Sequence, residues 1–456
     1  MSAIVFYFQL HQPFQLRPYT VFDLGVNHMY EDTESNRSLL RMLANNAYLP
    51  MNELLLSLIK KYKDRFNVSF SISGTTLEQF ADYAPDVLES FKKLAKTQNV
   101  EFIDETYSHS LAFLYSREEF SQQVLHHKER MQSLLGVSPV TFRNTELVYN
   151  NDLAAWIEDM GYEAILAEGA DHLLGWRSPN YIYQPVNCHK VRLLLRNHTL
   201  SDDIAIRFAD RSWPGFPLTA ETYAEWLHSL SPGAEVINLF MDYETFGTHY
   251  AADTGIFDFM RTLPGAVLKR ADFSFLTPSQ AVKQYPPMAK IDAPQYISWT
   301  DAERDLTAWL GNDMQLDAIE ALYKLEDNVR AVDSPELYQV WQRLQSSDHF
   351  YYMSTKWLSD REVHPTVNPY ASPYDAYINY MNVLADFEGT LTARLADKPA
   401  EDVKTPVAKT VGSSEKVAAK QKAVTTLKKD KAKTGRKPAK TAEQPEPVAK
   451  KAKKSV

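Results

Sequence analysis

Val236-Ile237-Asn238-Leu239-Phe240-Met241-Asp242 is a short apolar run that ends in a carboxylate. A second run, Val140-Thr141-Phe142-Arg143-Asn144-Thr145-Glu146, ends in the same way. Runs of this length and composition are typical of strands buried on both faces of a parallel sheet. In a barrel or an open α/β sheet, the loops after the strands form the cleft. The two runs therefore predict that Glu146 and Asp242 meet at one edge of a sheet.

Residues 1–293 alternate short apolar runs with stretches of helical spacing. Helices are predicted over 51–63, 85–96, 117–135 and 153–160. Such alternation predicts an α/β fold with a parallel sheet covered by helices, and seven strands fit an incomplete TIM-like barrel as well as an eight-stranded one. The seven predicted strands are Ile4–Leu10, Asn67–Ser73, Val100–Asp104, Val140–Glu146, Ala164–Ala167, Ile204–Phe208 and Val236–Asp242.

The pattern changes after Pro294, and no further strand is predicted. An all-helical C-terminal domain is expected over 294–397, following a catalytic barrel over 1–293. Residues 398–456 contain no Phe, Tyr or Trp and are rich in Lys and Ala, so this tail is predicted to be disordered. The predicted C-terminal helices are Asp301–Leu310, Met314–Ala331, Pro335–Ser346, Asp348–Lys356 and Tyr374–Leu395.

The net charge of −9 conceals two opposite parts. Residues 398–456 hold 17 basic and 6 acidic residues, whereas residues 1–397 hold 32 basic and 52 acidic residues. The acidic body argues against nucleic acid as the substrate and raises no objection to a neutral one. The basic tail is interpreted either as an arm that contacts anionic partners or as a solubilising segment.

The location is predicted to be cytoplasmic. The single cysteine, Cys188, excludes an intrachain disulfide. The amino terminus is interpreted as a first strand and not as a signal peptide, and no stretch approaches the roughly 20 apolar residues of a membrane span.

Polar side chains follow most of the predicted strands. His11 and Gln12 follow the first, Glu78 the second, and His109 the third. Glu146, Arg207 and Asp242 end the fourth, sixth and seventh. Structural polar groups should scatter to both ends of a sheet, so this bias indicates a functional edge.

Five segments in order resemble glycoside hydrolase family 57. They are His11-Gln12-Pro13, Gly74-Thr75-Thr76-Leu77-Glu78-Gln79, the strand ending in Glu146, the segment Asp242–Gly247, and Ala308-Trp309-Leu310-Gly311-Asn312. Tyr243 departs from the pattern, because the residue after the acid is commonly small in this family.

The resemblance implies an incomplete seven-stranded barrel and a retaining mechanism on α-linked glucans or maltooligosaccharides, with neither a metal nor a cofactor. It implies that Glu146 is the nucleophile and Asp242 the general acid/base. A retaining enzyme holds two such carboxyls roughly 5 Å apart, so these roles agree with the chemistry. The expected substrate-binding residues are His11, Gln12, Glu78, His109, Arg207, Trp309 and Asn312.

Several activities remain open at this point. Hydrolysis as an α-amylase and transfer as a 4-α-glucanotransferase differ only in the acceptor, while branching is disfavoured because the ordered chain is short. A metal-dependent polysaccharide deacetylase is more distant, because it would need a cluster of His and Asp ligands. His109, His126 and His127 are available, but no Asp-Asp pair ends the first strand. An inactive glucan-binding protein is disfavoured because both carboxylates are present.

Overall fold

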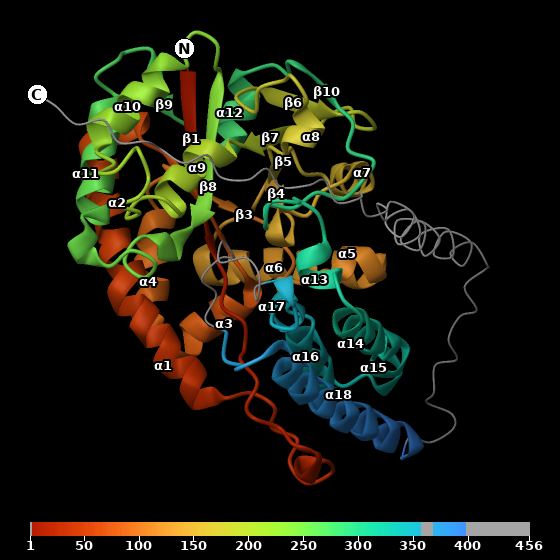
Figure 1. Cartoon of the computed structure of the whole chain (residues 1–456). Coiled ribbons are helices and arrows are strands. Elements are labelled where there is room, and N and C mark those ends of the chain that lie inside the picture. Colours follow the sequence, from red (N-terminus) through yellow and green to blue (C-terminus); the bar gives the residue numbers. More distant parts are fainter. Residues whose placement is uncertain (1, 357–367, 398–456) are drawn as a thin grey trace, which may run out of the picture. The chain divides into compact units, whose positions relative to one another are not determined.

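Seven strands form the barrel of this protein, and they are drawn as arrows in Figure 1. A computed structural model describes residues 2–356 and 368–397 of the chain. Within these residues the barrel strands are β1 (Ser2–Leu10), β2 (Val68–Ile72), β3 (Val100–Ile103), β4 (Thr141–Arg143), β5 (Ala164–Glu168), β7 (Arg192–Arg196) and β8 (Val236–Asp242).

The strands pair in two parallel rows. In the first, β1 lies between β2 and β8, and β3 follows β2. In the second, β5 lies between β4 and β7. A parallel bridge between Asp104 and Phe142 joins β3 to β4. At the other junction Asn238 of β8 accepts a hydrogen bond from the Asn197 backbone N–H (2.9 Å) and donates one to Leu195 (2.8 Å). The incomplete seven-stranded barrel is confirmed.

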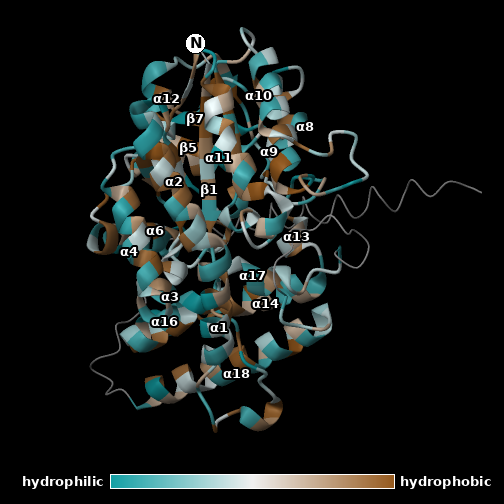
Figure 2. Cartoon of the chain, turned by 90° about the vertical axis from the view of Figure 1, so that its left-hand side faces the viewer, coloured by the Kyte–Doolittle hydropathy of each residue, from teal (hydrophilic) through white to brown (hydrophobic). Residues whose placement is uncertain are grey.

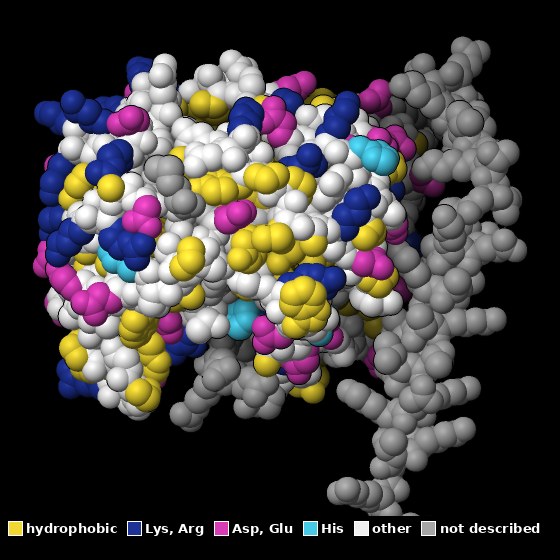
Figure 3. Space-filling model, turned by 90° about the horizontal axis from the view of Figure 1, so that it is seen from above, with side chains coloured by type: hydrophobic (Ala, Val, Ile, Leu, Met, Phe, Trp, Pro, Cys, Tyr) yellow, Lys and Arg dark blue, Asp and Glu magenta, His cyan; other side chains and the backbone are white. Residues whose placement is uncertain are grey.

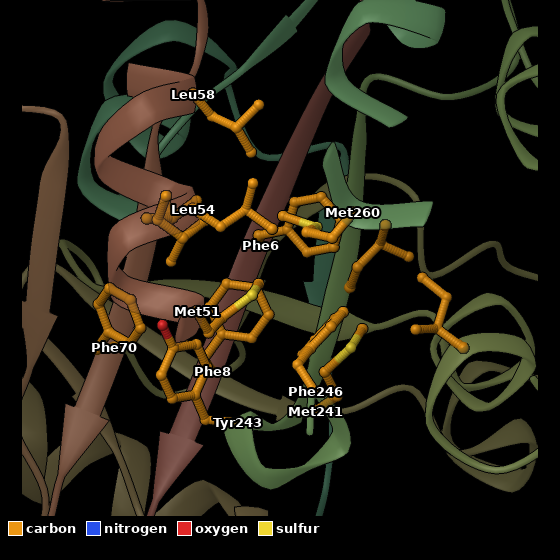
Figure 4. Close-up of a cluster of buried hydrophobic side chains, with 14 of the residues drawn as sticks. Phe6, Phe8, Met51, Leu54, Leu58, Phe70, Met241, Tyr243, Phe246 and Met260 are labelled. Carbon is orange, nitrogen blue, oxygen red and sulfur yellow. The ribbon is translucent and has the colours of Figure 1, made fainter. Parts of the chain in front are cut away.

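Strand β1 shows why the apolar runs are strands. Every one of its residues is buried, and successive side chains point to opposite faces of the sheet. Phe6 and Phe8 pack under helix α2, against Met51 and its neighbours (Figure 4). Tyr7 packs inside the barrel. Burying each large apolar side chain contributes about 1.5–3 kcal/mol, so a strand covered on both sides needs a continuous apolar run.

One strand prediction is wrong. Residues 204–208 do not form a strand. Ile204 and Ala205 are the last residues of helix α9 (His198–Ala205), and residues 206–208 form the turn that follows it. The side chain of Asn197 caps this helix by accepting from Leu200 N, and Leu200 and Ile204 are buried one turn apart. The cap outweighs the alternation of apolar residues at 204, 206 and 208. The sixth barrel strand is β7 instead.

Three short strands pair with the barrel strands or with one another, and helices cover the barrel. β9 (Phe273–Phe275) pairs with β1, while β6 (Ile182–Pro185) lies between β7 and β10 (Ala289–Ile291). Figure 2 shows the hydrophobic residues concentrated on the strands and on the inner sides of the helices. The helices are α1 (Thr33–Leu43), α2 (Leu49–Tyr62), α3 (Gly74–Tyr83), α4 (Pro85–Ala95), α5 (Ala112–Tyr115), α6 (Arg117–Leu135), α7 (Asn151–Asp159), α8 (Asp171–Leu174), α9, α10 (Ala220–Ser229), α11 (Ile256–Val267) and α12 (Pro278–Gln284).

After β10, every element of regular secondary structure in the described part of the chain is a helix. These helices lie beyond the carboxyl ends of the barrel strands (Figure 1). Of the predicted helix 301–310 only the last turn forms, because Asp301 and Arg304 have φ near +50°. The helices are α13 (Thr307–Leu310), α14 (Asp313–Lys324), α15 (Glu326–Val332), α16 (Pro335–Leu344), α17 (Ser347–Tyr351) and α18 (Pro373–Ala396).

The described barrel and C-terminal helices belong to one compact unit. A domain boundary at residues 293–294 therefore stays a prediction, and the predicted tail 398–456 lies outside the described residues. The end of the barrel at which the strands begin, seen from above in Figure 3, carries basic, acidic and hydrophobic side chains intermixed. None of the described helices has the length and apolar character needed to cross a membrane.

Gly247 supports the loop after β8 through a close backbone contact. It has φ +110°, and a Cβ built there would lie 2.0 Å from the backbone oxygen of Asn46. We expect Gly247→Ala to lower the free energy of unfolding by about 2–4 kcal/mol, measured by urea denaturation. Gly389→Ala is the matched control, because nothing lies within 4 Å of that site in helix α18. Equal stabilities of the two variants would contradict the constraint at Gly247.

Candidate active site

A cavity lies at the carboxyl ends of β1, β4 and β8, and we call it the site cavity. Both predicted catalytic carboxylates, Glu146 and Asp242, line it. The predicted binding residues His11, Gln12 and Trp309 line it as well. Residues distant in sequence are therefore brought together where the barrel meets the helical region. The other lining residues are Gln9, Pro13, Gln15, Leu39, Leu43, Glu244, Thr248, His249, Trp299, Thr300, Ser347, Asp348, Tyr351 and Tyr352.

Glu146 occupies an unusual backbone conformation. It lies in the 3-10 turn Thr145–Leu147 with φ 55° and ψ 28°. Left-handed conformations of residues other than glycine cost on the order of 1–3 kcal/mol and occur preferentially at functional sites. The turn is held in part by the Trp299 backbone N–H, which donates to the Glu146 backbone oxygen (3.2 Å).

The carboxylate of Glu146 receives hydrogen bonds on both oxygens. His109 Nε2 lies 2.9 Å from Oε1, and Trp299 Nε1 donates to Oε2 at 2.7 Å. Thr300 Oγ1 adds a longer bond of 3.3 Å to Oε2. Burial raises the pKa of Glu146, but the bond from His109 and the charges of His109 and Arg143 outweigh it and lower the pKa to about 2. Glu146 is therefore ionised at neutral pH.

The indole of Trp299 makes cation–π contacts with two guanidinium groups. The Arg143 and Arg196 carbons Cζ are 5.4 and 5.5 Å from its ring centroids. Arg196 is itself held by Glu168 (3.3 Å) and Asp202 (2.5 Å). These cation–π contacts fix the ring that donates to Glu146, so the orientation of the donor is set by buried charges.

His109 is completely buried and links two carboxylates. Its Nδ1 is 2.7 Å from Glu105 Oε2, while its Nε2 contacts Glu146. Burial lowers the pKa of His109, yet the charge of Glu105 and the bonds to both carboxylates outweigh burial and raise the pKa to about 9. Glu105 also lies 3.5 Å from Arg143 Nη1, and its pKa falls to about 2 against the opposing effect of burial. The result is a buried chain of alternating charges.

His11 stacks on His109 and connects the barrel to helix α17. The two ring centroids are 4.0 Å apart. His11 Nδ1 is 2.8 Å from Ser73 Oγ, and Nε2 is 2.7 Å from Asp348 Oδ2. Burial and the charge of His109 lower the pKa of His11. Burial opposes ionisation of Asp348, but His11, His109 and Ser346 together lower its pKa.

Asp242 and Glu244 are neighbours in different surroundings. Asp242 ends β8 opposite Gln9, whereas Glu244 accepts hydrogen bonds from Tyr48 Oη and Gln12 Nε2. Burial and the charge of Asp242 raise the pKa of Glu244 to about 7. Tyr243, between them, points into the core and donates to Asn52 Oδ1 (2.6 Å), which explains how this large residue is accommodated (Figure 4).

Comparison with known proteins assigns the chain to a family. The model of glycosyl hydrolase family 57 matches residues 5–294. A Methanocaldococcus jannaschii protein described as "Putative alpha-amylase" is 42% identical over 409 residues, covering 86% of this chain and 85% of that protein. The chain belongs to glycosyl hydrolase family 57. It is therefore a glycoside hydrolase, as the sequence predicted.

Solved structures of the family share the fold. A branching enzyme of this family from Thermococcus kodakaraensis has a TM-score of 0.61 at 13% identity, with coverage of 88% of this chain and 95% of that one. The Thermotoga maritima α-amylase AmyC has a TM-score of 0.58 at 15% identity, with the same coverage. A 4-α-glucanotransferase from Thermococcus litoralis has a TM-score of 0.59 at 16% identity and covers 84% of this chain, which spans 59% of the length of that enzyme.

Four of the predicted binding residues, Glu78, His109, Arg207 and Asn312, lie outside the lining of the site cavity, and their binding roles stay predictions. Glu78 is bonded to Arg343 Nη2 (2.6 Å) and Tyr107 Oη (2.7 Å), which ties the barrel to helix α16. Arg207 follows helix α9 and pairs with Asp203 (2.8 Å). Asn312 caps helix α14 by accepting from Gln315 N (3.0 Å). Each of these contacts is sufficient to explain the residue structurally.

His109 and Trp309 are both buried side chains. His109 is buried behind Glu146, so its contact is with the carboxylate. Trp309 lines the cavity but is only 2% exposed, because it packs in the helical core. Both predicted binding roles stay predictions.

Some residues at the site were not predicted from the sequence. Trp299 and Thr300 follow the short strand β10, and Asp348 and Tyr351 lie on helix α17. Glu105 carried a signal, because a carboxylate and a histidine four residues apart follow β3. The other four residues lie in segments without a distinctive pattern.

The histidines considered as metal ligands are bonded elsewhere. His127 Nδ1 is 2.5 Å from Asp104 Oδ1, and its Nε2 is 2.8 Å from the Ile72 oxygen. His126 stacks on Tyr107 with ring centroids 4.0 Å apart. Residues 2–356 and 368–397 contain no group of three or more His, Cys, Asp or Glu side chains that could hold a metal ion.

Trp299→Phe removes one donor from Glu146 and keeps most of the ring. A hydrogen bond to a charged group is worth about 1.5–3 kcal/mol, so we expect kcat/KM to fall about 10- to 100-fold. Trp341→Phe is the matched control, because Trp341 is a buried donor to the Leu322 oxygen in the helical core. It should lower the melting temperature and leave kcat/KM within about twofold. The same loss of activity in both variants would contradict a specific role for Trp299.

Proposed function

We propose that this family 57 enzyme is a retaining glycoside hydrolase that acts on α-1,4-linked glucans, with Glu146 as nucleophile and Asp242 as general acid/base. The observation that carries the proposal is the environment of Glu146. A half-buried carboxylate held ionised by His109, Arg143 and Trp299 suits attack on an anomeric carbon. Asp242 in the same cavity supplies the second carboxyl that the reaction requires.

The reaction proceeds in two balanced steps. In the first, Glu146 forms a bond to the anomeric carbon while Asp242 gives its proton to the departing glycosidic oxygen. In the second, Asp242 takes a proton from water, the water oxygen bonds to the anomeric carbon, and the Glu146 ester bond breaks. Two inversions give net retention, and Asp242 regains its proton.

The substrate class follows from the cavity and the relatives. The lining combines hydrogen-bonding groups such as Gln12 and Glu244 with the apolar Leu39, Leu43 and Trp309. Such a surface suits a neutral sugar, whose hydroxyls need partners and whose C–H faces need apolar contact. The names of the relatives include α-amylases, a 4-α-glucanotransferase and a branching enzyme, all of which act on α-glucans.

The catalytic assignment is tested by changing the leaving group. We expect Glu146→Gln to lose more than about 10³-fold in kcat/KM on both maltoheptaose and α-maltosyl fluoride. Asp242→Asn should lose about 10²–10⁴-fold on maltoheptaose and far less on the fluoride, because fluoride leaves without a proton. The first product of the parent enzyme should keep the α-configuration, as followed by NMR.

Glu244→Gln is the comparison for this test, because Glu244 lines the same cavity two residues beyond Asp242. If Glu244→Gln shows the selective loss and Asp242→Asn does not, the acid role belongs to Glu244. An inverted first product would contradict the retaining mechanism altogether.

The acceptor is tested by product length. Hydrolysis of maltoheptaose should give only glucose and shorter chains, whereas transfer gives longer chains and branching gives α-1,6 signals in the NMR spectrum. We expected the short chain to disfavour branching, but this expectation is not supported. The chain matches 95% of the length of a family 57 branching enzyme, so length does not distinguish the two activities. We expect shorter products alone, and longer or branched products would replace hydrolysis by transfer.

A further inference from the structure

Glu105 lies behind the nucleophile, on the far side of His109. It is completely buried at the end of β3, with Oε2 2.7 Å from His109 Nδ1. The other nitrogen of His109 lies 2.9 Å from Glu146 Oε1. Both ring nitrogens therefore face carboxylate oxygens. A neutral imidazole carries only one N–H, so one carboxylate would face a lone pair unless the ring holds two protons.

We propose that Glu105 is a positioning residue, whose negative charge keeps His109 doubly protonated so that Glu146 faces an N–H donor throughout the catalytic cycle. This inference rests on the proposed role of Glu146 as nucleophile. Glu105 acts through His109 and does not line the site cavity.

The other charges around His109 make Glu105 necessary. Arg143 of β4 lies 3.5 Å from His109 Nδ1, and the ring of His11 from β1 is stacked at 4.0 Å. The cation at Arg143 disfavours a second positive charge. Asp348 of α17 acts at longer range through His11, and His127 of α6 faces Glu105. Among the described residues, the carboxylates in direct contact with the ring are Glu105 and Glu146.

Glu105 and Glu146 are not both negatively charged throughout the proposed reaction. When Glu146 forms the glycosyl ester, it loses its negative charge, and Glu105 becomes the direct counter-charge of His109. An uncompensated imidazolium in this buried position would lose its proton. A neutral ring has a single N–H, and this N–H need not face Glu146 as the ester bond breaks. Glu105 thus matters most for the second step.

A purely structural role fits the local bonding less well. Glu105 Oε1 is buried, and within the described residues it is without a hydrogen-bond partner. A buried ionised group with an unsatisfied oxygen reduces stability, and a neutral side chain of the same shape often serves the fold as well or better. The charge is therefore explained by what it does to His109.

The test measures ionisation at the nucleophile without the acid. In an Asp242→Asn background, hydrolysis of α-maltosyl fluoride needs no proton on the leaving group, so its pH profile reports on Glu146 and His109. The parent should lose activity on the alkaline side near the His109 pKa of about 9. Adding Glu105→Gln should move this limb by more than about one pH unit towards the ordinary histidine value and lower kcat about 10- to 100-fold. Glu105→Asp keeps the charge, so the alkaline limb of this variant should lie close to that of the Asp242→Asn enzyme.

Asp104→Asn is the matched control. Asp104 follows β3 directly before Glu105 and is also a buried partner of a histidine, His127. His127 donates to the Ile72 oxygen and does not contact Glu146. We expect Asp104→Asn to lower the melting temperature and leave the pH profile in place. A profile that does not move in Glu105→Gln, or that moves equally in Asp104→Asn, overturns the proposal.

Two further measurements separate the possible failures. A 15N-histidine NMR titration of the full chain, with His109→Asn for assignment, should show a doubly protonated His109 up to pH 8; a ring that titrates below pH 7 overturns the proposal even if Glu105→Gln does not fold. If Glu146→Gln keeps full activity, the proposed function fails. If Glu146→Gln is inactive and the profile of Glu105→Gln matches its parent, the inference about Glu105 alone fails.

Discussion

The imidazole of His109, held between Glu105 and Glu146, is the contact on which the site depends. An ionised carboxylate without partners would not persist at the half-buried position of Glu146, since desolvation there raises its pKa. The partner cation is completely buried and needs a counter-charge of its own. Three groups from two strand ends therefore have to be in place together, and each makes the ionisation of the next possible.

The barrel explains how these groups meet. Parallel strands end at one edge, so Glu105 after β3, Arg143 of β4 and Asp242 of β8 converge although they are far apart in the sequence. The region after β10 completes the site from the other side. Trp299 donates to Glu146, and Asp348 holds His11 against His109. The helical region thus supplies bonds on which the barrel carboxylates rely, which is consistent with one compact unit.

The fold could be predicted where burial dictates composition. Strands β1 and β8 are covered on both faces, so only continuous apolar runs such as 4–10 and 236–242 suit them. The prediction failed at 204–208, where the Asn197 cap fixed a helix that apolar alternation could not reveal. At the site, Asn312 of a family motif also caps helix α14, so the motif alone does not separate a structural from a binding role, and its binding role stays a prediction. Asp348 carried no local signal, since only the tertiary fold brings it to His11.

Environment divides the carboxylates of the cavity into different chemical states. Glu146 and Asp348 each face an imidazole, and their pKa values are lowered. Glu244 is bonded to the neutral groups of Tyr48 and Gln12, and its pKa is raised to about 7. Its proton is held partly by the charge of Asp242, so it is bound most firmly whenever Asp242 is ionised. In the proposed cycle that moment is the glycosyl-enzyme, when Glu146 is neutral and Asp242 has given up its proton. A protonated Glu244 at that moment keeps a third negative charge out of the cavity, which leaves Asp242 as the base that receives the proton from the acceptor.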